Sequence, residues 1–564
     1  MRLHVLRFSV LFSAGAALLG GCASVVSRAP MSCDQLATLT VPAANIGLPT
    51  NGAKVISATL VSAGGTAPKT FGDYCNVVGE ISPIDPSAPN IKFQLALPAQ
   101  WNQRALMLGG GGFDGTVPNI IGNVAAGPSN SPNPLGRGYA VFGSDSGHAG
   151  ASNQGRFGMN DEALKNFAFE ALKKTRDAAV FLIDQRYGER PQRSYFAGGS
   201  TGGREALTVT QKWPKDFDGV IALYPAFNAV SLDLQFGRIT RALAQPGAYL
   251  NLAKRKALYD AAYQACDSAD GLTDGLISNP AACTASFNPA TALLDGKPLR
   301  CEGGADTGNT CLSDAQIAAM NVINTPITFG YPLLSGETQY PGFNTWGTDF
   351  GRDGAGVQLY VNFLGLSSVA PSFPMPTPPA ALAAGPPYGA TFWDQWVKYF
   401  VTRDASFNSF TLDPEQPGRW ATRISELSGW QDATKADLSD FEGRGGKILM
   451  AHGTTDQLVS TRATEQYYAR VRAAMGATRT DGFMRYYEIP GYGHAASTTF
   501  NAAWDSVTAL ENWVERGVAP SDQVVFDSTG IPGRSRPLCD YPSWPKYRGS
   551  GDANAATSFV CVVL

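Results

Sequence analysis

Residues 193–205, RSYFAGGSTGGRE, are the most informative stretch of this 564-residue chain. They place the pattern Gly-x-Ser-x-Gly, with Ser200 at its centre, between an expected strand at 193–197 and an expected helix from about Gly203. Small residues here let the chain turn sharply enough to project a serine hydroxyl above the edge of a sheet. The stretch therefore predicts a strand, a turn and a helix, with Ser200 as a candidate nucleophile. The alternative is a glycine-rich turn without a chemical role.

The segments around this turn alternate between the two kinds of secondary structure. The expected elements are strands at 91–99, 104–108, 139–143, 219–223, 447–451 and 486–489 and helices at about 161–187 and 502–516. Strands that alternate with helices indicate an α/β fold with a mostly parallel sheet.

This alternation stops between residues 226 and 434. The segment holds four cysteines, an acidic loop and a proline-rich stretch. The simplest interpretation is a single α/β domain, built from residues 22–225 and 435–564, with an insertion at 226–434. A chain of this length, 44% hydrophobic and 16% charged, has enough apolar residues for such a core.

Composition excludes several other classes of protein. The 44 Lys and Arg against 47 Asp and Glu give a net charge of −3, and no basic run is longer than the three residues 254–256. A nucleic-acid partner is therefore not expected. The hydrophobic content excludes intrinsic disorder, and the 62 Gly and 37 Pro exclude a coiled coil.

The first 21 residues have the features of an export signal. Arg2 and Arg7 precede a short apolar stretch that ends in Leu-Gly-Gly-Cys at 19–22. This ending resembles the lipobox of bacterial lipoproteins, in which Cys22 is lipidated after cleavage. The expected location is then the outer membrane, reached only through the lipid anchor. The alternative is an ordinary signal peptide and a periplasmic or secreted protein.

The remaining eight cysteines are an even number, which indicates four disulfides in an exported protein. No Cys-x-x-Cys pair occurs, so a zinc site is not expected. Spacing alone does not decide the pairing. Local pairing is the simplest arrangement: Cys33–Cys75, Cys266–Cys283, Cys301–Cys311 and Cys539–Cys561.

A serine nucleophile needs a base and an acid. The chain has four histidines: His4, His148, His452 and His494. The chain order Ser, acid, His favours His494 as the base, with Asp456 after the strand 447–451 as the acid. We expect His452 to brace the loop that carries Asp456, and His148 to have a structural role.

The oxyanion that forms on attack needs two N–H donors. One is expected from Thr201, which follows the candidate nucleophile at the positive end of a helix. The other is expected from the glycine run 109–112, where the backbone can approach a ligand closely.

Taken together, these motifs resemble the tannase/feruloyl esterase family over nearly the whole mature chain. They are STGGRE (200–205), GGGG (109–112), SDSGH (144–148), KILMAHGTTD (447–456), PGYGH (490–494) and SRPLCDYPSWPKYRGSGD (535–552). The resemblance implies an α/β-hydrolase whose insertion at 226–434 is a lid over the site. It implies a triad of Ser200, Asp456 and His494, and an oxyanion hole formed by Gly112 and Thr201.

The acidic loop CDSADGLTDG at 266–275 places three carboxylates among glycines, which suits a hard cation. The spacing is not that of an EF-hand. The resemblance implies a structural Ca²⁺ held by the carboxylates of Asp267, Asp270 and Asp274 and the backbone carbonyls of Leu272 and Leu276. The alternative is a solvated acidic turn fixed by a disulfide.

One departure from the family is expected to matter. Members of the family usually carry a disulfide between the residue before the serine and the residue after the histidine, which here are Gly199 and Ala495. We expect these two backbones to pack closely without a covalent link. Gly199→Cys with Ala495→Cys should then form a disulfide.

Aromatic side chains are frequent in the insertion, as in WDQWVKYF at 393–400. Most are expected in helix cores, but an aromatic acyl group could bind among them. The leading hypothesis is a serine esterase for phenolic acid esters, such as feruloyl or galloyl esters. A terephthalate monoester is the alternative substrate, disfavoured because residues 353–402 contain no arginine and only Lys398. A third hypothesis is a calcium-stabilised binding protein without activity.

Overall fold

The computed structural model of the protein describes residues 29–376, 379 and 385–563. The expected signal segment 1–21 and the candidate lipidation site Cys22 lie outside the described residues. Across the described ranges, we find no helix with the length and apolar character needed to span a membrane.

A ten-stranded sheet forms the centre of the molecule, in the order β1-β2-β5-β6-β8-β7-β9-β10-β15-β16. Its strands are β1 (Thr40–Val41), β2 (Ala53–Val61), β5 (Tyr74–Ile81), β6 (Ile91–Pro98), β7 (Arg104–Leu108), β8 (Ala140–Ser144), β9 (Arg193–Gly199), β10 (Gly219–Leu223), β15 (Lys447–Gly453) and β16 (Met484–Ile489). The pairings from β8 to β16 are parallel. Those from β1 to β8 are antiparallel. The sheet is therefore mixed, with the expected parallel part on one side.

The expected strands agree with the structure more closely than the expected helices. Strands β7 and β10 have the predicted bounds, whereas β1, β2 and β5 were not predicted. The helix expected at 161–187 is divided into α2 (Asp161–Lys165) and α3 (Ala171–Tyr187) by a π-helical turn at 166–170. The last helix, α15 (Ser506–Arg516), begins later than predicted because Ala502–Ala503 form strand β17 and Asp505 caps the helix.

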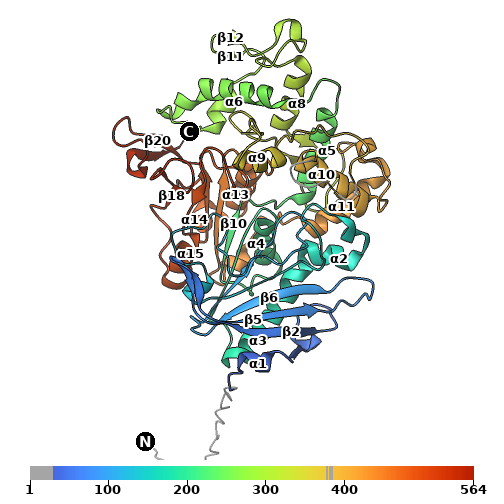
Figure 1. The fold of residues 1–564 in the computed structure, drawn as a ribbon, viewed down its shortest axis with the longest axis vertical. Helices are drawn as coiled ribbons and strands as arrows, with labels where there is room; N and C mark the ends of the chain where they lie inside the picture. Colours follow the sequence, from blue (N-terminus) through green and yellow to red (C-terminus); the bar gives the residue numbers. More distant parts are fainter. Residues whose placement is uncertain (1–28, 377–378, 380–384, 564) are drawn as a thin grey trace, which may run out of the picture.

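Helices cover both faces of the parallel part of the sheet (Figure 1). Alternate residues of β9 belong to two hydrophobic cores, with Phe196 in one and Tyr195 in the other. Helix α3 and helix α4 (Thr201–Lys212) pack into the first core, and α15 packs into the second. A parallel sheet buried on both faces fits the continuous apolar sequence of β10.

Between β10 and β15, the described part of the chain adds no strand to this sheet. It contains α5 (Ala229–Leu243), α6 (Leu252–Cys266), α7 (Pro280–Ser286), α8 (Asp314–Asn324), α9 (Val357–Leu364), α10 (Tyr388–Trp396), α11 (Ala421–Gln431), α12 (Ser439–Glu442) and two small sheets, β11 (Leu293–Leu294) with β12 (Lys297–Pro298) and β13 (Ile327–Thr328) with β14 (Gln339–Tyr340). Most of this segment lies at the upper end of the molecule in Figure 1.

The remaining elements lie at the two ends of the chain. They are α1 (Cys33–Leu36), β3 (Gly64–Thr66), β4 (Lys69–Phe71), α13 (Thr461–Met475), α14 (Ala477–Asp481), β18 (Val524–Asp527), β19 (Ser535–Pro537), β20 (Trp544–Tyr547) and β21 (Phe559–Val562). Strands β17, β18 and β19 form a small antiparallel sheet, and β20 pairs with β21.

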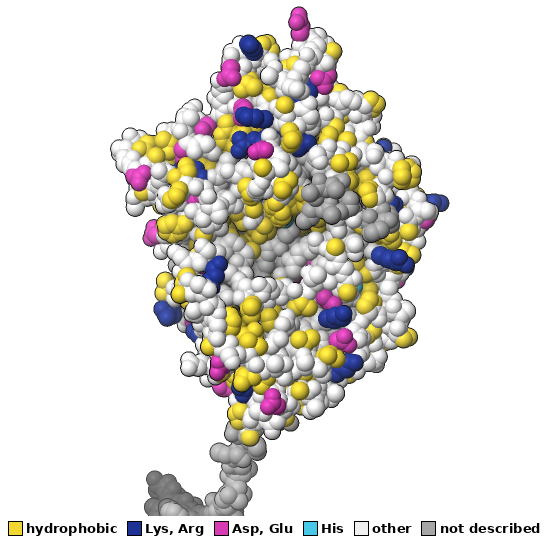
Figure 2. Space-filling model, in the orientation of Figure 1, with side chains coloured by type: hydrophobic (Ala, Val, Ile, Leu, Met, Phe, Trp, Pro, Cys, Tyr) yellow, Lys and Arg dark blue, Asp and Glu magenta, His cyan; other side chains and the backbone are white. Residues whose placement is uncertain are grey.

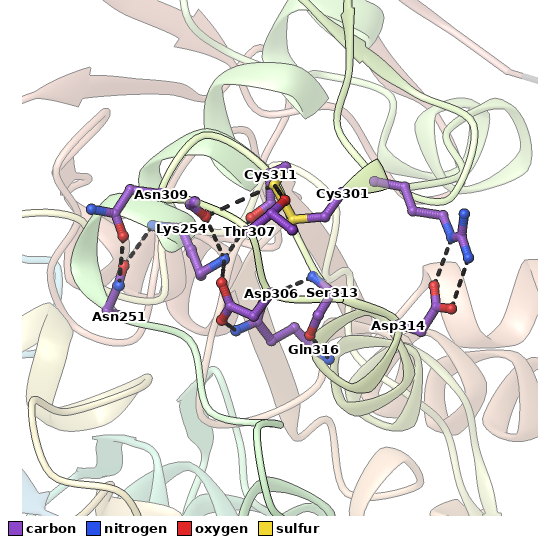
Figure 3. Close-up of a disulfide and its surroundings, with 12 residues drawn as sticks. Asn251, Lys254, Cys301, Asp306, Thr307, Asn309, Cys311, Ser313, Asp314 and Gln316 are labelled. Carbon is purple, nitrogen blue, oxygen red and sulfur yellow. Dashed lines mark hydrogen bonds and ion pairs between the residues drawn. A yellow bond between two sulfur atoms is a disulfide. The ribbon is translucent and has the colours of Figure 1, made fainter. Parts of the chain in front are cut away.

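In the described chain, each of the eight cysteines forms a disulfide with the cysteine that comes next or just before it along the sequence. The pairs are Cys33–Cys75, Cys266–Cys283, Cys301–Cys311 and Cys539–Cys561. Figure 3 shows the bond between Cys301 and Cys311, which closes a loop next to Lys254 of α6.

The ammonium group of Lys254 holds this loop against α6. Its Nζ atom donates to the carbonyls of Gly308 and Cys311, each at 2.7 Å. It also lies 2.9 Å from the carboxylate of Asp306, which accepts a further bond from Gln316 of α8. The Lys254 side chain is only 3% exposed. One buried cation therefore connects the disulfide loop with two helices.

We predict that Lys254→Met lowers the midpoint of thermal unfolding. The substitution keeps the length of the side chain but leaves two carbonyls and a carboxylate without their donor, at a cost of about 1–3 kcal/mol. The matched control is Lys256→Met, because Lys256 lies on the same helix, its side chain is 59% exposed, and among the described residues its one ion pair is with Asp260. Circular dichroism melts that shift equally for both variants would contradict this role of Lys254.

Candidate active site

Ser200 lies in a sharp turn between the end of β9 and the start of α4. Its backbone has φ 60° and ψ −123°, a strained conformation for a residue with a side chain. Its N–H donates to the carbonyl of Leu223 at the end of β10, at 3.1 Å, and its carbonyl accepts from the N–H of Ala226 at 3.1 Å. The neighbouring strand therefore holds the turn in this conformation.

The glycines around Ser200 allow three pieces of backbone to touch. A Cβ atom on Gly198 would lie 2.5 Å from the backbone of Gly202, and one on Gly202 would lie 2.9 Å from the carbonyl oxygen of Gly110. The N–H of Gly202 donates to that same carbonyl at 3.1 Å. Helix α4 thus packs directly on β9 and on the loop 109–112.

The structure brings the three predicted triad residues together. The Oγ atom of Ser200 lies 3.0 Å from Nε2 of His494, and Nδ1 of His494 lies 2.8 Å from Oδ2 of Asp456. Asp456 follows β15 and His494 follows β16, so the three side chains come from one edge of the parallel sheet. Such a chain of serine, imidazole and carboxylate can move a proton away from the hydroxyl.

Asp456 is buried and remains ionised. Its Oδ1 atom accepts from the N–H groups of Leu458 and Val459, both at 2.8 Å. Burial alone would raise the pKa of Asp456, but His494 and His452 outweigh it by charge and hydrogen bonding and lower the pKa well below its usual range. The carboxylate is therefore suited to stabilise an imidazolium.

His452 contacts this carboxylate and is held in place from the other side. Its Nε2 atom lies 3.2 Å from Oδ2 of Asp456, and its Nδ1 atom lies 2.8 Å from Oγ1 of Thr464. The position agrees with a role in bracing the acid. The other buried histidine, His148, stacks on Phe157 with ring centroids 3.6 Å apart, and burial lowers the pKa of His148 to about 4.

The two expected oxyanion donors also lie side by side. The hydroxyl of Thr201 donates to the carbonyl of Gly112 at 2.6 Å, which links α4 to the glycine loop. Gly112 has φ +60°, and a Cβ atom there would lie 2.3 Å from the hydroxyl oxygen of Tyr388. Among the described residues, no protein group accepts from the N–H of Gly112 or of Thr201. Both N–H groups are thus free to bind a ligand.

Sequence reasoning missed a pair of carboxyl groups that fixes the glycine loop. Glu205 of α4 accepts from the N–H of Gly110 at 3.1 Å and lies against Asp114. Burial raises the pKa of Asp114 to about 6 and raises the pKa of Glu205 well above its usual range. Each carboxyl group therefore disfavours ionisation of the other. The Glu of STGGRE was visible in the sequence, but its partner was not.

The structure shows what lies next to Gly199, the first position of the expected engineered disulfide. A Cβ atom on Gly199 would lie 2.5 Å from Cζ and 2.6 Å from Oη of Tyr224. The ring of Tyr224 also packs against the imidazole of His494, with centroids 4.9 Å apart. The space beside Gly199 is therefore filled by Tyr224, and a cysteine at 199 would require this ring to move before it could reach Ala495.

A cavity of about 620 Å³ opens beside Ser200 and His494. The segment 226–434 contributes much of its lining, including Tyr360, Phe363, Leu364, Tyr388 and Phe392. Phe392 stacks on Phe113 with ring centroids 3.6 Å apart. The neighbouring Trp393 and Trp396 are fully buried, as expected for helix-core residues. Figure 2 shows a hollow near the middle of one face, with hydrophobic side chains on its upper border.

The predicted calcium loop, residues 266–275, directly follows α6 in the segment between β10 and β15. Across the described ranges, no three His, Cys, Asp or Glu side chains are arranged so that they could hold a metal ion. Asp274 forms an ion pair with Arg536. Asp267 accepts from the N–H of Gly275 at 3.0 Å through Oδ2, while its buried Oδ1 atom has no partner within the described chain.

The other two aspartates of the loop accept hydrogen bonds from backbone N–H groups. The N–H of Leu272 donates to Asp270 and the N–H of Leu276 donates to Asp274, each at 3.1 Å. Burial raises the pKa of Asp270 to about 6, and the charges of Asp274 and Asp267 add to the shift. The three carboxylates thus repel one another, a situation that a cation would relieve.

Comparisons with known proteins agree with this site. Residues 75–562 match the family described as tannase and feruloyl esterase. An uncharacterized esterase of Agrobacterium fabrum is 39% identical over 94% of this chain and 92% of its own. Mono(2-hydroxyethyl) terephthalate hydrolase of Piscinibacter sakaiensis is 31% identical over 87% of this chain and 85% of its own. The crystal structure of feruloyl esterase B from Aspergillus oryzae, which is 24% identical, has a similar fold. The TM-score is 0.71, and the match covers 94% of this chain and 99% of the other. The chain belongs to the tannase and feruloyl esterase family of carboxylic ester hydrolases.

Proposed function

We propose that the protein hydrolyses esters of phenolic acids, such as feruloyl or galloyl esters, with Ser200, His494 and Asp456 as its catalytic triad. The observation that supports this proposal best is that Ser200 and His494, the latter bonded to Asp456, line a cavity rich in aromatic side chains.

In the first half of the reaction, the Oγ atom of Ser200 attacks the ester carbonyl while Nε2 of His494 takes its proton. The oxyanion accepts from the N–H groups of Gly112 and Thr201. The bond to the leaving alcohol then breaks, and His494 returns the proton to that oxygen. Asp456 keeps the imidazole in the correct tautomer and stabilises its positive charge.

In the second half, water replaces the alcohol. His494 takes a proton from water, the hydroxide oxygen bonds to the acyl carbon, and the oxyanion again accepts from the same two N–H groups. Collapse of this intermediate breaks the bond to Ser200 and releases the acid, while the proton returns to Oγ.

The cavity lining supports an aromatic acyl group. It includes five aromatic side chains against which a ring can pack: Phe113, Tyr360, Phe363, Tyr388 and Phe392. A second candidate substrate is a terephthalate monoester, because a 31% identical relative is named mono(2-hydroxyethyl) terephthalate hydrolase.

We predict that the purified protein cleaves methyl ferulate and methyl gallate faster than a terephthalate monoester. Ser200→Ala should abolish turnover of the whole panel and prevent labelling by an active-site phosphonate, because the variant has no nucleophile. Chromatographic detection of the released acid measures both effects. A folded wild-type protein that is never labelled at Ser200 would instead be a binding protein without activity, and undiminished turnover by Ser200→Ala would reject this mechanism.

We also predict that the two histidines near Asp456 differ in their importance. His494→Ala should lower kcat by about 10³-fold or more, because the base is lost. His452→Ala removes only a brace of the acid and should cost at most about 10²-fold, as expected from a small misplacement. Single-turnover kinetics with p-nitrophenyl acetate compare the two variants. If His452→Ala lowered kcat more than His494→Ala does, the assignment of His494 as the base would be wrong.

We further propose that the loop 266–275 binds Ca²⁺ as a structural ion. The carboxylates of Asp267, Asp270 and Asp274 with the carbonyls of Leu272 and Leu276 would hold the ion. The unpartnered Oδ1 atom of Asp267 and the mutual repulsion of the three carboxylates support this proposal. As they lie in the structure, the three carboxylates are not grouped closely enough to hold an ion, so binding would have to draw them together. Asp274 would also have to share its carboxylate between the ion and Arg536.

If this proposal holds, removal of calcium lowers the midpoint of thermal unfolding, and Ca²⁺ at a hundredfold excess over its Kd restores about 2.7 kcal/mol. Asp270→Asn should abolish the calcium-dependent shift. Asp295→Asn serves as the control, because this exposed residue lies outside the loop in the same segment. Melts that are identical with EDTA and with Ca²⁺ would reject a calcium site.

A further inference from the structure

Two buried polar side chains line the cavity beside Ser200 without a part in the proposed reaction. Asp233 of α5 is 1% exposed, and Gln431 at the end of α11 is 2% exposed. In the part of the chain that the structure describes, Oδ1 of Asp233 and Nε2 of Gln431 have no hydrogen-bond partner. Buried polar groups in folded proteins almost always have one, so these two need a specific explanation.

Asp233 belongs to an otherwise apolar helix face. Ala229, Leu232, Asp233 and Phe236 line the cavity at helical spacings of three and four residues. The other three side chains would contact only the apolar parts of a bound ring. A carboxyl group among them suggests that one part of the ligand is polar.

The guanidinium of Arg204 lies at the same cavity, but much of its hydrogen-bonding capacity is used by the protein. It donates to the backbone carbonyls of Ala168 and Gln431 through one nitrogen and to that of Phe167 through the other, at 3.2–3.3 Å. It also packs on the ring of Phe167, 4.8 Å from the centroid. Arg204 is therefore fixed as part of the cavity wall.

The charges around Arg204 disfavour an anionic ligand. Four carboxyl groups interact with it electrostatically: Asp114, Glu205, Asp233 and Asp432. Burial raises the pKa of Asp432 to about 8 and raises the pKa of Asp233 well above its usual range. The four carboxyl groups already compete for the charge of Arg204, so a further carboxylate would gain little from it, whereas a neutral hydroxyl does not depend on that charge.

We infer that Asp233 and Gln431 bind a phenolic hydroxyl of the acyl group, and so select hydroxylated rings over unsubstituted or carboxylated ones. This inference rests on the proposed function of the same site. A phenol donates to a carboxyl oxygen and accepts from an amide N–H, which satisfies both unpartnered groups. A ring without the hydroxyl would leave both groups unpaired and would therefore react more slowly.

The test compares methyl 4-hydroxycinnamate with methyl cinnamate, which differ by one hydroxyl group. We expect the wild type to favour the hydroxylated ester by about 10–100-fold in kcat/KM. Asp233→Leu should reduce this preference about tenfold or more, chiefly by slowing the hydroxylated ester. The matched control is Phe236→Leu on the same helix face, which should slow both esters alike and keep their ratio.

Two results would overturn the inference: a wild-type ratio near one, or a variant Asp233→Leu that slows both esters equally. Thermal melts establish that each variant is folded. If Asp233→Leu does not fold, Gln431→Met carries the same test, with the same loss of preference expected.

Carboxylated rings give an independent comparison. Methyl 4-hydroxybenzoate should be cleaved faster than monomethyl terephthalate, and the reverse order would reject the hydroxyl site. Failure of the proposed function looks different from failure of this inference. A wild type that cleaves p-nitrophenyl acetate but neither cinnamate ester would reject the aromatic substrate itself, whereas equal cleavage of both cinnamates rejects only the roles of Asp233 and Gln431.

Discussion

The close contact between the first turn of α4 and the loop 109–112 is the constraint on which the site depends. It is a contact of backbone with backbone, possible because Gly109, Gly198 and Gly202 have no side chains. The same contact brings Thr201 next to Gly112, whose carbonyl accepts from the Thr201 hydroxyl. Ser200 can keep its strained backbone because β10 holds the turn from the other side. A single methyl group at Gly198 or Gly202 would collide with this backbone and push α4 and Ser200 out of their present positions.

Those parts of the molecule that depend on local sequence could be predicted. Strands β7 and β10 are short apolar runs between glycines and polar residues, and their bounds agree with the structure. Ser200, Asp456 and His494 each follow a buried strand of the parallel half-sheet, and parallel strands bring their C-terminal ends to one edge. We could therefore expect the three side chains to meet without knowing the order of the strands in the sheet.

The parts that could not be predicted depend on contacts between distant residues. Strand β2 lies near the edge of the sheet with most of its side chains at least partly exposed, so it lacks a clear alternating pattern. The interaction between the carboxyl groups of Asp114 and Glu205 joins two residues separated in sequence by the whole of α3 and β9. Phe392 lines the cavity while Trp393 next to it is buried in the core, and a one-residue rotation of α10 would exchange them.

The side chain of Tyr224 contacts both the turn that carries Ser200 and the imidazole of His494. From the sequence we expected the backbone at Gly199 to pack against that at Ala495; the side chain next to Gly199, that of Tyr224, was not expected. The phenol ring occupies the space that a side chain at 199 would need and packs on the imidazole that must face Ser200. A ring held by packing limits the rotation of His494 from one side, while Asp456 fixes its Nδ1 atom from the other. Tyr224 follows β10 and Asp456 follows β15, so the position of the His494 ring depends on both strands. The geometry of the site therefore depends on how the parallel strands pack.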